Sequence, residues 1–253
     1  MTRRRLAILA AGLPVAALAL LAAAGPAAAQ SLNLDLGEGA GSSASTMIQI
    51  IALVTILSLA PSILVMVTSF TRIVVVLSFL RSALGIQQTP PNSVLISLAL
   101  FLTAFIMMPT MQTIYDDAIV PLVNQQVSEL QALDLAAAPV REFMLQHVRE
   151  QDLRLFMDMA DLEMVDEPQD TPMRALIPAF MISELKRAFE IGFLLFLPFL
   201  IIDMVVASIL MSMGMLMLPP VIISLPFKLI FFVLVDGWYL VAGSLVQSYG
   251  IGP

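Results

Sequence analysis

The chain has 253 residues, of which 59% are hydrophobic and only 12% are charged. Soluble domains have about 45–50% apolar and about 25% charged residues, so this composition excludes an ordinary soluble enzyme and is typical of a membrane protein. The chain has no cysteine and a single histidine, which excludes a thiolate nucleophile, a disulfide framework and a cysteine-bound metal. The formal charge of −7 argues against binding of nucleic acid by a basic surface.

Residues 1–29 have the pattern of a secretory signal peptide. Three arginines at positions 3–5 form the basic segment, residues 6–21 form the apolar segment, and small residues precede the expected cleavage after Ala29. The alternative is an uncleaved signal anchor, which Pro14 and the alanine-rich composition disfavour. Cleavage would leave nine basic and nineteen acidic residues, a net charge of −10.

Residues 47–115 are predicted to form a helical hairpin, preceded by a flexible extracytoplasmic tail rich in Gly and Ser at residues 30–46. Its apolar segments are residues 47–67, which continue as an amphipathic stretch to residue 84, and residues 93–111. Each is long enough to cross about 30 Å of hydrocarbon as a helix. The turn between them holds a helix-ending glycine, a double proline and a capping asparagine: Gly85, Pro90, Pro91 and Asn92.

Residues 189–253 are predicted to form a second hairpin. Its first apolar segment, residues 189–218, is interrupted by Pro198, and its second, residues 222–246, contains Pro226. We therefore expect an all-α fold in which four long apolar helices associate in two pairs.

The acidic residues 116–188 separate the two hairpins. Arg72 and Arg81 lie between the first two spans, so the positive-inside rule places that turn in the cytoplasm and residues 116–188 outside it. Six of the nine basic residues of the mature chain lie in this outer region, against the rule, although long loops are translocated largely regardless of charge.

Hydropathy does not distinguish helices in lipid from helices buried among other subunits. Arg72 and Arg81 lie in an otherwise apolar run, which favours protein neighbours.

Within the acidic region, the apolar periodicity predicts an amphipathic helix over residues 138–160, followed by a loop at residues 165–172. His147 lies on or beside the apolar face of this helix. A proton switch is one interpretation, but no carboxylate, serine or metal-ligand pattern accompanies the histidine, so we expect a structural or solvated histidine.

The sequence lacks a phosphate-binding loop, an H-E-x-x-H helix and a G-x-S-x-G elbow. Ser212 precedes Gly214 by two residues, but the first glycine of the elbow is missing. We therefore expect no enzymatic activity and no cofactor, and a membrane-embedded hydrolase is strongly disfavoured.

A methionine-rich stretch lies next to a glycine and a double proline at the tip of the second hairpin. Methionine is flexible and polarizable, so it can seal an irregular or changing gap, while ordinary core filling is an equal alternative. The residues are Met204, Met211, Met213, Met215 and Met217.

Asp203, Lys228 and Asp236 lie inside otherwise apolar segments, where an ionised group is costly unless it is paired or hydrated. Structural pairing between helices or subunits is the favoured interpretation. A proton or ion relay is the alternative, and it would make the chain a small-solute or proton-coupled transporter, for which an inverted repeat is expected but little similarity between the hairpins is seen.

Several ordered motifs resemble the FliP family of flagellar biosynthetic proteins. The resemblance covers roughly residues 47–249 and is carried by motifs at residues 69–77, 80–85, 87–92, 183–186, 198–203, 213–215, 219–220, 225–228 and 235–238. These include SFTRIVVVL and QQTPPN in the first half and LPFK and VDGW in the second.

The resemblance implies a non-enzymatic core subunit of the flagellar type III export gate, in the inner membrane at the basal body. Several copies would assemble with two other small membrane proteins, in contact with lipid, into a helical oligomeric channel for unfolded export substrates. Met213, Met215 and Met217 would form the gasket of the closed channel, although Leu216 interrupts the usual run of methionines. The family also suggests an ion pair between subunits, which maps to Glu184 and Lys228.

The homologue from injectisome type III secretion is the alternative within the same resemblance. The signal peptide and the LPFK motif at residues 225–228 favour the flagellar branch.

Overall fold

The computed structural model describes residues 40–86, 88–162, 167–215 and 217–250. Every regular element in these residues is a helix, which confirms the predicted all-α class. The predicted signal peptide lies outside the described residues. The chain divides into two compact units, Met1–Leu57 and Ser58–Pro253, and the second contains all helices from α3 onward.

Helix α2 (Ala40–Val67) begins inside the predicted tail, of which residues 40–46 are described and helical. The small residues Ala, Ser and Thr are tolerated in a helix, so the apolar helix that follows extends through them.

Helix α3 (Phe70–Leu84) is separated from α2 by Thr68 and Ser69, whereas the sequence pattern predicted one continuous stretch. The Thr68 hydroxyl donates to the Leu64 carbonyl at 2.6 Å, and the Thr71 hydroxyl donates to the Val65 carbonyl at 2.8 Å. These side chains occupy carbonyls that a continuous helix would use, which favours a break.

The second apolar segment is longer than predicted and bent. It consists of α4 (Asn92–Ile106), α5 (Met108–Ile114), a π-helix η1 (Tyr115–Ile119) and α6 (Val120–Val123). The axis turns by 59° between the part ending at Ile106 and the part beginning at Met108. Pro109, in the first turn of α5, has no N–H to continue the hydrogen bonding of α4, which accounts for the bend.

Two helices occupy the region for which one amphipathic helix was predicted: α7 (Glu129–His147) and α8 (Glu150–Met159). They are separated by extended residues Val148 and Arg149, and the Arg149 N–H donates to the Ser183 hydroxyl at 3.0 Å. The sequence pattern did not reveal this break because its cause is a contact with a distant helix. A short 3-10 turn, η2 (Pro168–Asp170), follows within the predicted loop.

Helix α9 (Met173–Ser212) is one continuous helix of 40 residues, which crosses the predicted boundary at residue 189. Pro178 and Pro198 lie inside it without ending it. A proline removes one helical hydrogen bond, and packing along the rest of a long apolar helix can offset this loss.

The last apolar segment is divided into α10 (Pro220–Leu234) and α11 (Gly237–Gln247), which are bent by 63°. Asp236, at the break, has a φ of 50° in the left-handed region. Side chains disfavour this conformation, so the bend is imposed by packing rather than by local preference.

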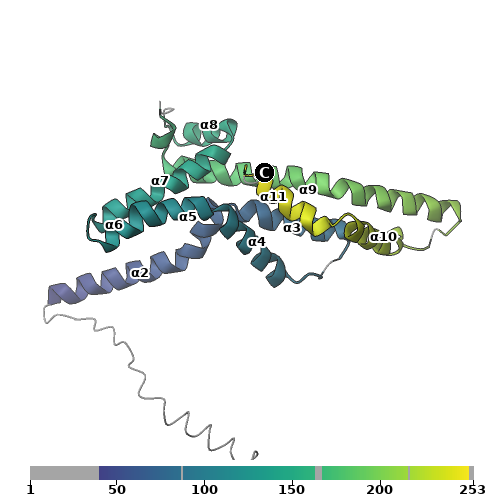
Figure 1. Cartoon of the computed structure of the whole chain (residues 1–253), viewed down its shortest axis with the longest axis horizontal. Helices are drawn as coiled ribbons and strands as arrows, with labels where there is room; N and C mark the ends of the chain where they lie inside the picture. Colours follow the sequence, from purple (N-terminus) through teal and green to yellow (C-terminus); the bar gives the residue numbers. More distant parts are fainter. Residues whose placement is uncertain (1–39, 87, 163–166, 216, 251–253) are drawn as a thin grey trace, which may run out of the picture. The chain divides into compact units, whose positions relative to one another are not determined.

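Helix α3 packs against α9, α4 and α10 and forms the centre of the second unit (Figure 1). This helix is buried around most of its circumference, and Arg72 is among its buried residues. Arg72 therefore needs a partner inside the protein. The largest fully buried side chains of this core are Arg72, Ile73, Leu77, Leu80, Leu84, Ile106, Met107, Met144, Leu176, Phe180 and Leu245.

Among the described helices, α9 alone is long and apolar enough to cross a membrane by itself. Up to four spans result if each of three bent helix pairs counts as one: the two parts of α2 about Pro61, α4 with α5 to α6, and α10 with α11. These match the four predicted apolar segments, while their pairing into two hairpins stays a prediction.

Candidate functional site

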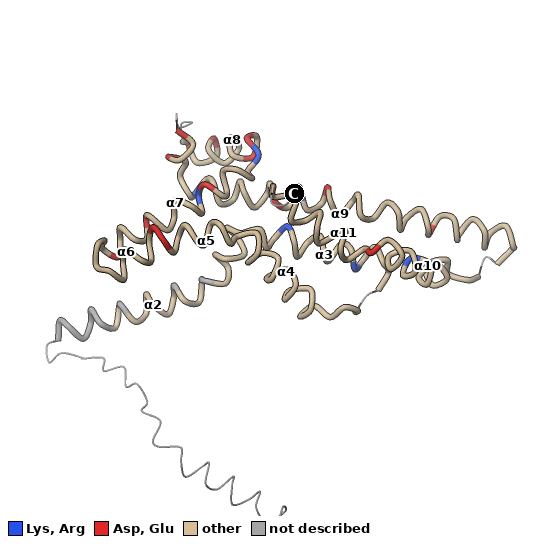
Figure 2. The backbone as a smooth tube through the Cα atoms, viewed as in Figure 1, with Lys and Arg blue, Asp and Glu red and all other residues tan. Residues whose placement is uncertain are grey.

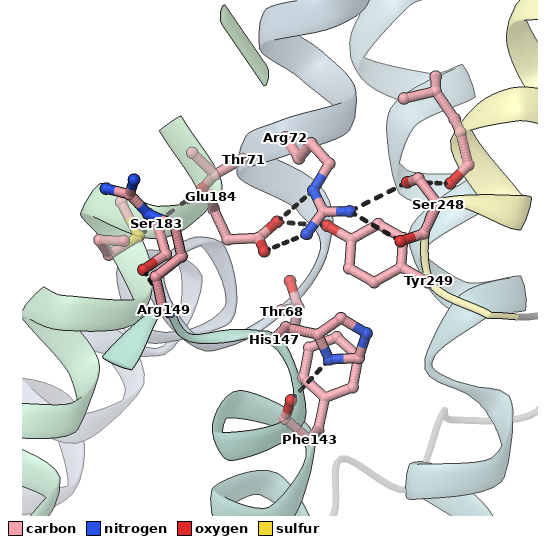
Figure 3. A network of polar contacts seen from close by, with 12 residues as sticks. Thr68, Thr71, Arg72, Phe143, His147, Arg149, Ser183, Glu184, Ser248 and Tyr249 are labelled. Carbon is pink, nitrogen blue, oxygen red and sulfur yellow. Dashed lines mark hydrogen bonds and ion pairs between the residues drawn. The ribbon is translucent and has the colours of Figure 1, made fainter. Parts of the chain in front are cut away.

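Arg72 and Glu184 form a buried ion pair between the first turn of α3 and the first third of α9 (Figure 3). Both residues are 0% exposed. The Arg72 Nε donates to Glu184 Oε2 at 2.8 Å, and Nη2 donates to Oε1, so the guanidinium binds both carboxylate oxygens. Such bidentate, charge-assisted bonds are strong and directional, and they offset part of the cost of burying two charges.

Residues that follow α11 complete this pair. The Arg72 Nη1 donates to the Ser248 carbonyl at 3.2 Å and to the Ser248 hydroxyl at 2.9 Å. The Tyr249 hydroxyl donates to Glu184 Oε2, and the Arg72 Cζ lies 3.8 Å from the centroid of the Tyr249 ring. Burial, together with the Glu184 charge, raises the pKa of Tyr249 well above its ordinary value, so the hydroxyl keeps the proton that it donates.

The network continues toward α8 through Ser183, the neighbour of Glu184 in α9. The Ser183 hydroxyl donates to Asp152 Oδ2 at 2.6 Å. Arg149 binds both Asp152 oxygens, with distances of 2.8 Å from Nε and 2.7 Å from Nη2. Polar contacts therefore connect α3, α9 and the segment after α11 across the apolar core (Figure 3), and the bond from Ser183 to Asp152 extends them to α8.

A second buried cluster joins α9, α10 and the end of α3. The Lys228 side chain is 4% exposed, and its Nζ donates to Asp203 Oδ2 at 2.6 Å and to the Ala83 carbonyl at 3.2 Å. The Ser224 hydroxyl donates to the other Asp203 oxygen. Because Ala83 lies in the last turn of α3, the ammonium also faces the negative end of that helix dipole.

Glu184 and Lys228, the predicted pair between subunits, each have a different partner within the chain. Glu184 binds Arg72, and Lys228 binds Asp203. A pair between Glu184 of one copy and Lys228 of another stays a prediction, and it would have to form beside these contacts or replace them.

Arg81 and Asp236, the remaining predicted charge-pairing residues, form no ion pair in the described part of the chain. The Arg81 Nη1 donates to the Asn92 side chain and, at 3.5 Å, to the Pro90 carbonyl. These contacts stabilise the turn before α4. Asp236 is exposed at the bend between α10 and α11.

The methionine-rich tip begins where α9 ends at a Schellman motif. Gly214, with a φ of 75°, donates its N–H to the Met211 carbonyl at 3.1 Å, and the Met215 N–H donates to the Leu210 carbonyl at 3.0 Å. Met213, Met215 and Met217 are 62%, 44% and 99% exposed, so these three methionines do not fill the core of the single chain. Leu216 lies outside the described residues.

The tip is joined to a wide apolar surface on α9 and α10. A wholly apolar groove of about 420 Å³ lies between the two helices. It is lined by Ile201, Ile202, Val205, Val206, Ile209, Leu210, Ile223 and Phe227. An exposed apolar surface of this kind marks a site that contacts lipid or other apolar helices.

His147 has the surroundings of a structural histidine. It is 8% exposed, its Nδ1 lies 2.8 Å from the Phe143 carbonyl oxygen, and its ring centroid lies 4.7 Å from that of Phe143 and 4.9 Å from that of Tyr249. Burial lowers the pKa of His147 from its ordinary value near 6.5, and the Arg72 and Arg187 charges act in the same direction against the Phe143 carbonyl and Glu184. In the described residues, no group of three His, Asp or Glu side chains is arranged to hold a metal ion.

We expect stability to fall as the pH is lowered from about 6.5. Because the folded pKa of His147 is lowered, the unfolded chain binds the proton first, so acid favours unfolding until the pH passes below the folded pKa. Unfolding of the detergent-solubilised chain between pH 7.5 and 5 measures this slope. The slope should be smaller in His147→Gln, and an equal slope in both chains would contradict the prediction.

Sequence reasoning missed Asp152, Ser183, Ser248 and Tyr249. The spacing of Arg149 and Asp152, three residues apart in a helical region, was a weak signal for their pair. The contacts of Ser183, Ser248 and Tyr249 join segments up to 176 residues apart, for which a single sequence gives no signal. Together the two clusters hold helices to one another, and their charges are used within the protein rather than presented to a substrate.

The chain matches the FliP family model over residues 53–245. It is 57% identical over 246 residues to the flagellar biosynthetic protein FliP of Caulobacter vibrioides, covering 97% of this chain and 89% of that protein. It is 55% identical over 207 residues to the protein of the same name from Bacillus subtilis, covering 82% of this chain and 94% of that protein. A family match over most of the chain, with relatives this similar along most of their own length, shows that the chain belongs to the FliP family.

Proposed function

We propose that the chain is a core subunit of the flagellar type III protein export gate, crossing the inner membrane several times at the base of the flagellum. The observation that carries this proposal is the similarity, at 57% and 55% identity, to flagellar biosynthetic proteins of Caulobacter vibrioides and Bacillus subtilis over 97% and 82% of the chain. The names of these relatives also favour the flagellar role over the injectisome alternative.

The proposed gate is a channel built from several copies of the chain together with two other small membrane proteins. The exposed apolar face of α9 supports this assembly, because side chains such as Phe189, Phe193 and Met204 are 57–64% exposed on the single chain. An apolar surface of this extent is buried by lipid or by neighbouring helices. The buried charge clusters then serve to fix the helices of one subunit before they pack against the next.

Within the gate, Met213, Met215 and Met217 would close the channel around its axis. Their side chains are exposed at a tip that the Schellman motif at Gly214 holds in place. Flexible thioether side chains can close on each other and still yield to export substrates of different shapes.

Replacing Met213, Met215 and Met217 together with alanine is expected to raise leakage of ions across the inner membrane, because shorter side chains leave the closed channel unfilled. The three side chains are exposed, so the stability of the chain should change by less than about 0.5 kcal/mol per residue. Conductance of purified gates in planar bilayers, with assembly checked by mass, measures the leak.

A matched control replaces three other exposed methionines, Met108, Met111 and Met159, with alanine. This control should leave conductance unchanged. Equal conductance of the tip variant and the unmodified gate would contradict the role of the methionines as a seal.

The two charge clusters argue against the transporter hypothesis. Two of the three residues of the proposed proton or ion relay, Asp203 and Lys228, are bound to each other and to Ser224 and Ala83. The third, Asp236, is exposed at the bend between α10 and α11. Solute flux through the purified chain alone, without partner proteins, would restore that hypothesis and contradict the gate.

A further inference from the structure

The turn between α6 and α7 carries exposed apolar side chains that the export-gate proposal does not use. Leu122, Val123, Leu130 and Leu133 are 37%, 74%, 76% and 66% exposed. We call these four residues the α6–α7 tip. Single exposed leucines are ordinary, but four exposed apolar side chains on the facing ends of α6 and α7 indicate a surface that is covered in the working protein.

The turn that presents these side chains is built as a rigid structure. Gln125, with a φ of 57°, donates its N–H to the Leu122 carbonyl at 3.0 Å, and the Gln126 N–H donates to the Pro121 carbonyl at 2.9 Å. This Schellman motif closes α6, and a capping box between Ser128 and Gln131 opens α7. The α6–α7 tip is therefore held outward by two capping motifs and is prearranged for binding.

The surroundings of the tip are acidic. Asp116, Asp117, Glu129 and Asp134 are exposed, and none of them forms an ion pair in the described part of the chain. The sequence has no Lys or Arg between Arg81 and Arg141. Figure 2 shows acidic but no basic positions in η1, which precedes α6, and in the first half of α7, which follows it.

This charge disfavours lipid as the occupant of the tip. The pair of α4 with α5 to α6 is long and apolar enough for one bent span, but Asp116 and Asp117 lie one to two turns before the tip. Insertion of this end into hydrocarbon would bring them and the exposed amides of Gln125 and Gln126 toward a region where polar groups are costly. Anionic headgroups would be repelled by four carboxylates that no basic residue of the turn offsets.

The charge also disfavours a second copy of this chain. The mature chain would have a net charge of −10, and five of its nine basic residues, Arg72, Arg149, Arg154, Lys186 and Lys228, are engaged in ion pairs within the chain. A copy therefore offers little free positive charge to an acidic surface.

We propose that the α6–α7 tip is a docking surface for a protein of a different sequence, which presents an apolar groove flanked by Lys and Arg side chains. The four apolar side chains enter the groove, and Glu129 and Asp134 contact the basic rim. The apolar contact supplies most of the affinity, and the charges fix orientation and exclude acidic neighbours.

The test places the photo-reactive residue p-benzoylphenylalanine at Leu130 of the full-length chain in living cells and identifies the cross-linked peptide by mass spectrometry. The expected adduct is a peptide of another protein with Lys or Arg beside the linked position. In a chain that also carries Glu129→Lys and Asp134→Lys, the adduct yield should fall about tenfold, since two attractive contacts become repulsive.

Two controls make the result specific. The first control carries Glu167→Lys and Asp170→Lys, two exposed residues between α8 and α9. It should change the adduct yield by less than about twofold, as expected for surface charges outside the contact. The same probe at Leu155, which is 49% exposed on α8, should give an adduct that is insensitive to reversal at Glu129 and Asp134. An adduct with lipid only, with a second copy, or with a yield independent of Glu129 and Asp134 overturns the proposal, and so does the absence of any adduct.

Discussion

Replacing Arg72 with methionine is expected to lower the free energy of unfolding by about 3–5 kcal/mol, because the substitution leaves the Glu184 carboxylate buried without its cation. It also removes the contacts with Ser248 and the Tyr249 ring. Denaturant unfolding of the full chain in detergent, followed by circular dichroism, measures the loss. A loss below about 1 kcal/mol, the value of a surface pair, would show that the pair is not buried as described.

Arg154→Met is the matched control for this substitution. Arg154 pairs with Glu150 on α8, and the two side chains are 61% and 72% exposed. Removing this surface pair should cost between about 0 and 1 kcal/mol. The double variant Arg72→Met with Glu184→Met should recover much of the loss, because it removes both buried charges together.

A charge-swap experiment distinguishes the pair within the chain from the predicted pair between subunits. Glu184→Arg should be rescued in stability by Arg72→Glu, since the two side chains face each other directly. Rescue of oligomer formation, but not of stability, when Glu184→Lys is combined with Lys228→Glu would instead support a contact between copies. The two outcomes separate the folding of one subunit from its assembly.

Replacing Gly192 with alanine is expected to destabilise the chain by about 1–3 kcal/mol, although helix propensity alone predicts a gain of about 0.5–1 kcal/mol. The added Cβ would lie 2.6 Å from Phe79 Cδ2 and 2.8 Å from Phe79 Cγ, so α3 and α9 could not keep their spacing. Phe79 is held by an edge contact with Phe189, with ring centroids 5.0 Å apart, which limits how far its ring can move. The same unfolding measurement in detergent gives the change.

Gly243 provides the control for Gly192. It also lies inside a helix, α11, but a Cβ there meets no atom within 4 Å. Gly243→Ala should therefore stabilise the chain by about 0.5–1 kcal/mol. In a Phe79→Ala background, Gly192→Ala should lose its cost, and a persistent cost there would show that the contact with Phe79 is not its cause.

The breaks between helices show where reasoning from sequence failed. The turn after Gly85 and the double proline before α4 follow from backbone chemistry that each residue carries by itself, and they lie where the sequence indicated. Pro198 misled the prediction, because a proline in a long apolar helix is tolerated when the rest of the helix is packed. The break at Arg149 was missed because Ser183, 34 residues away, accepts the hydrogen bond from its N–H.

For the charged residues too, the residue type was informative and the contacts between distant segments were not predictable. Their position in apolar segments marked Arg72, Asp203 and Lys228 as groups that needed partners, and in the structure they lie in the pairs Arg72–Glu184 and Lys228–Asp203. Which residue pairs with which was not available from spacing, since the partners lie 25 and 112 residues apart. The predicted role of the three exposed methionines as a seal stays a prediction until the gate is measured.

Apolar composition, proline and glycine positions and ordered motifs are properties of the residues in order, and they were enough to predict an all-helical, membrane-type chain that resembles the FliP family. The tertiary structure alone decided that Glu184 binds Arg72 and Tyr249, that Lys228 binds Asp203, and that a glycine at position 192 is required for close packing. These contacts depend on how distant helices approach one another, and the approach is set by the sum of many weak contacts that no single motif records.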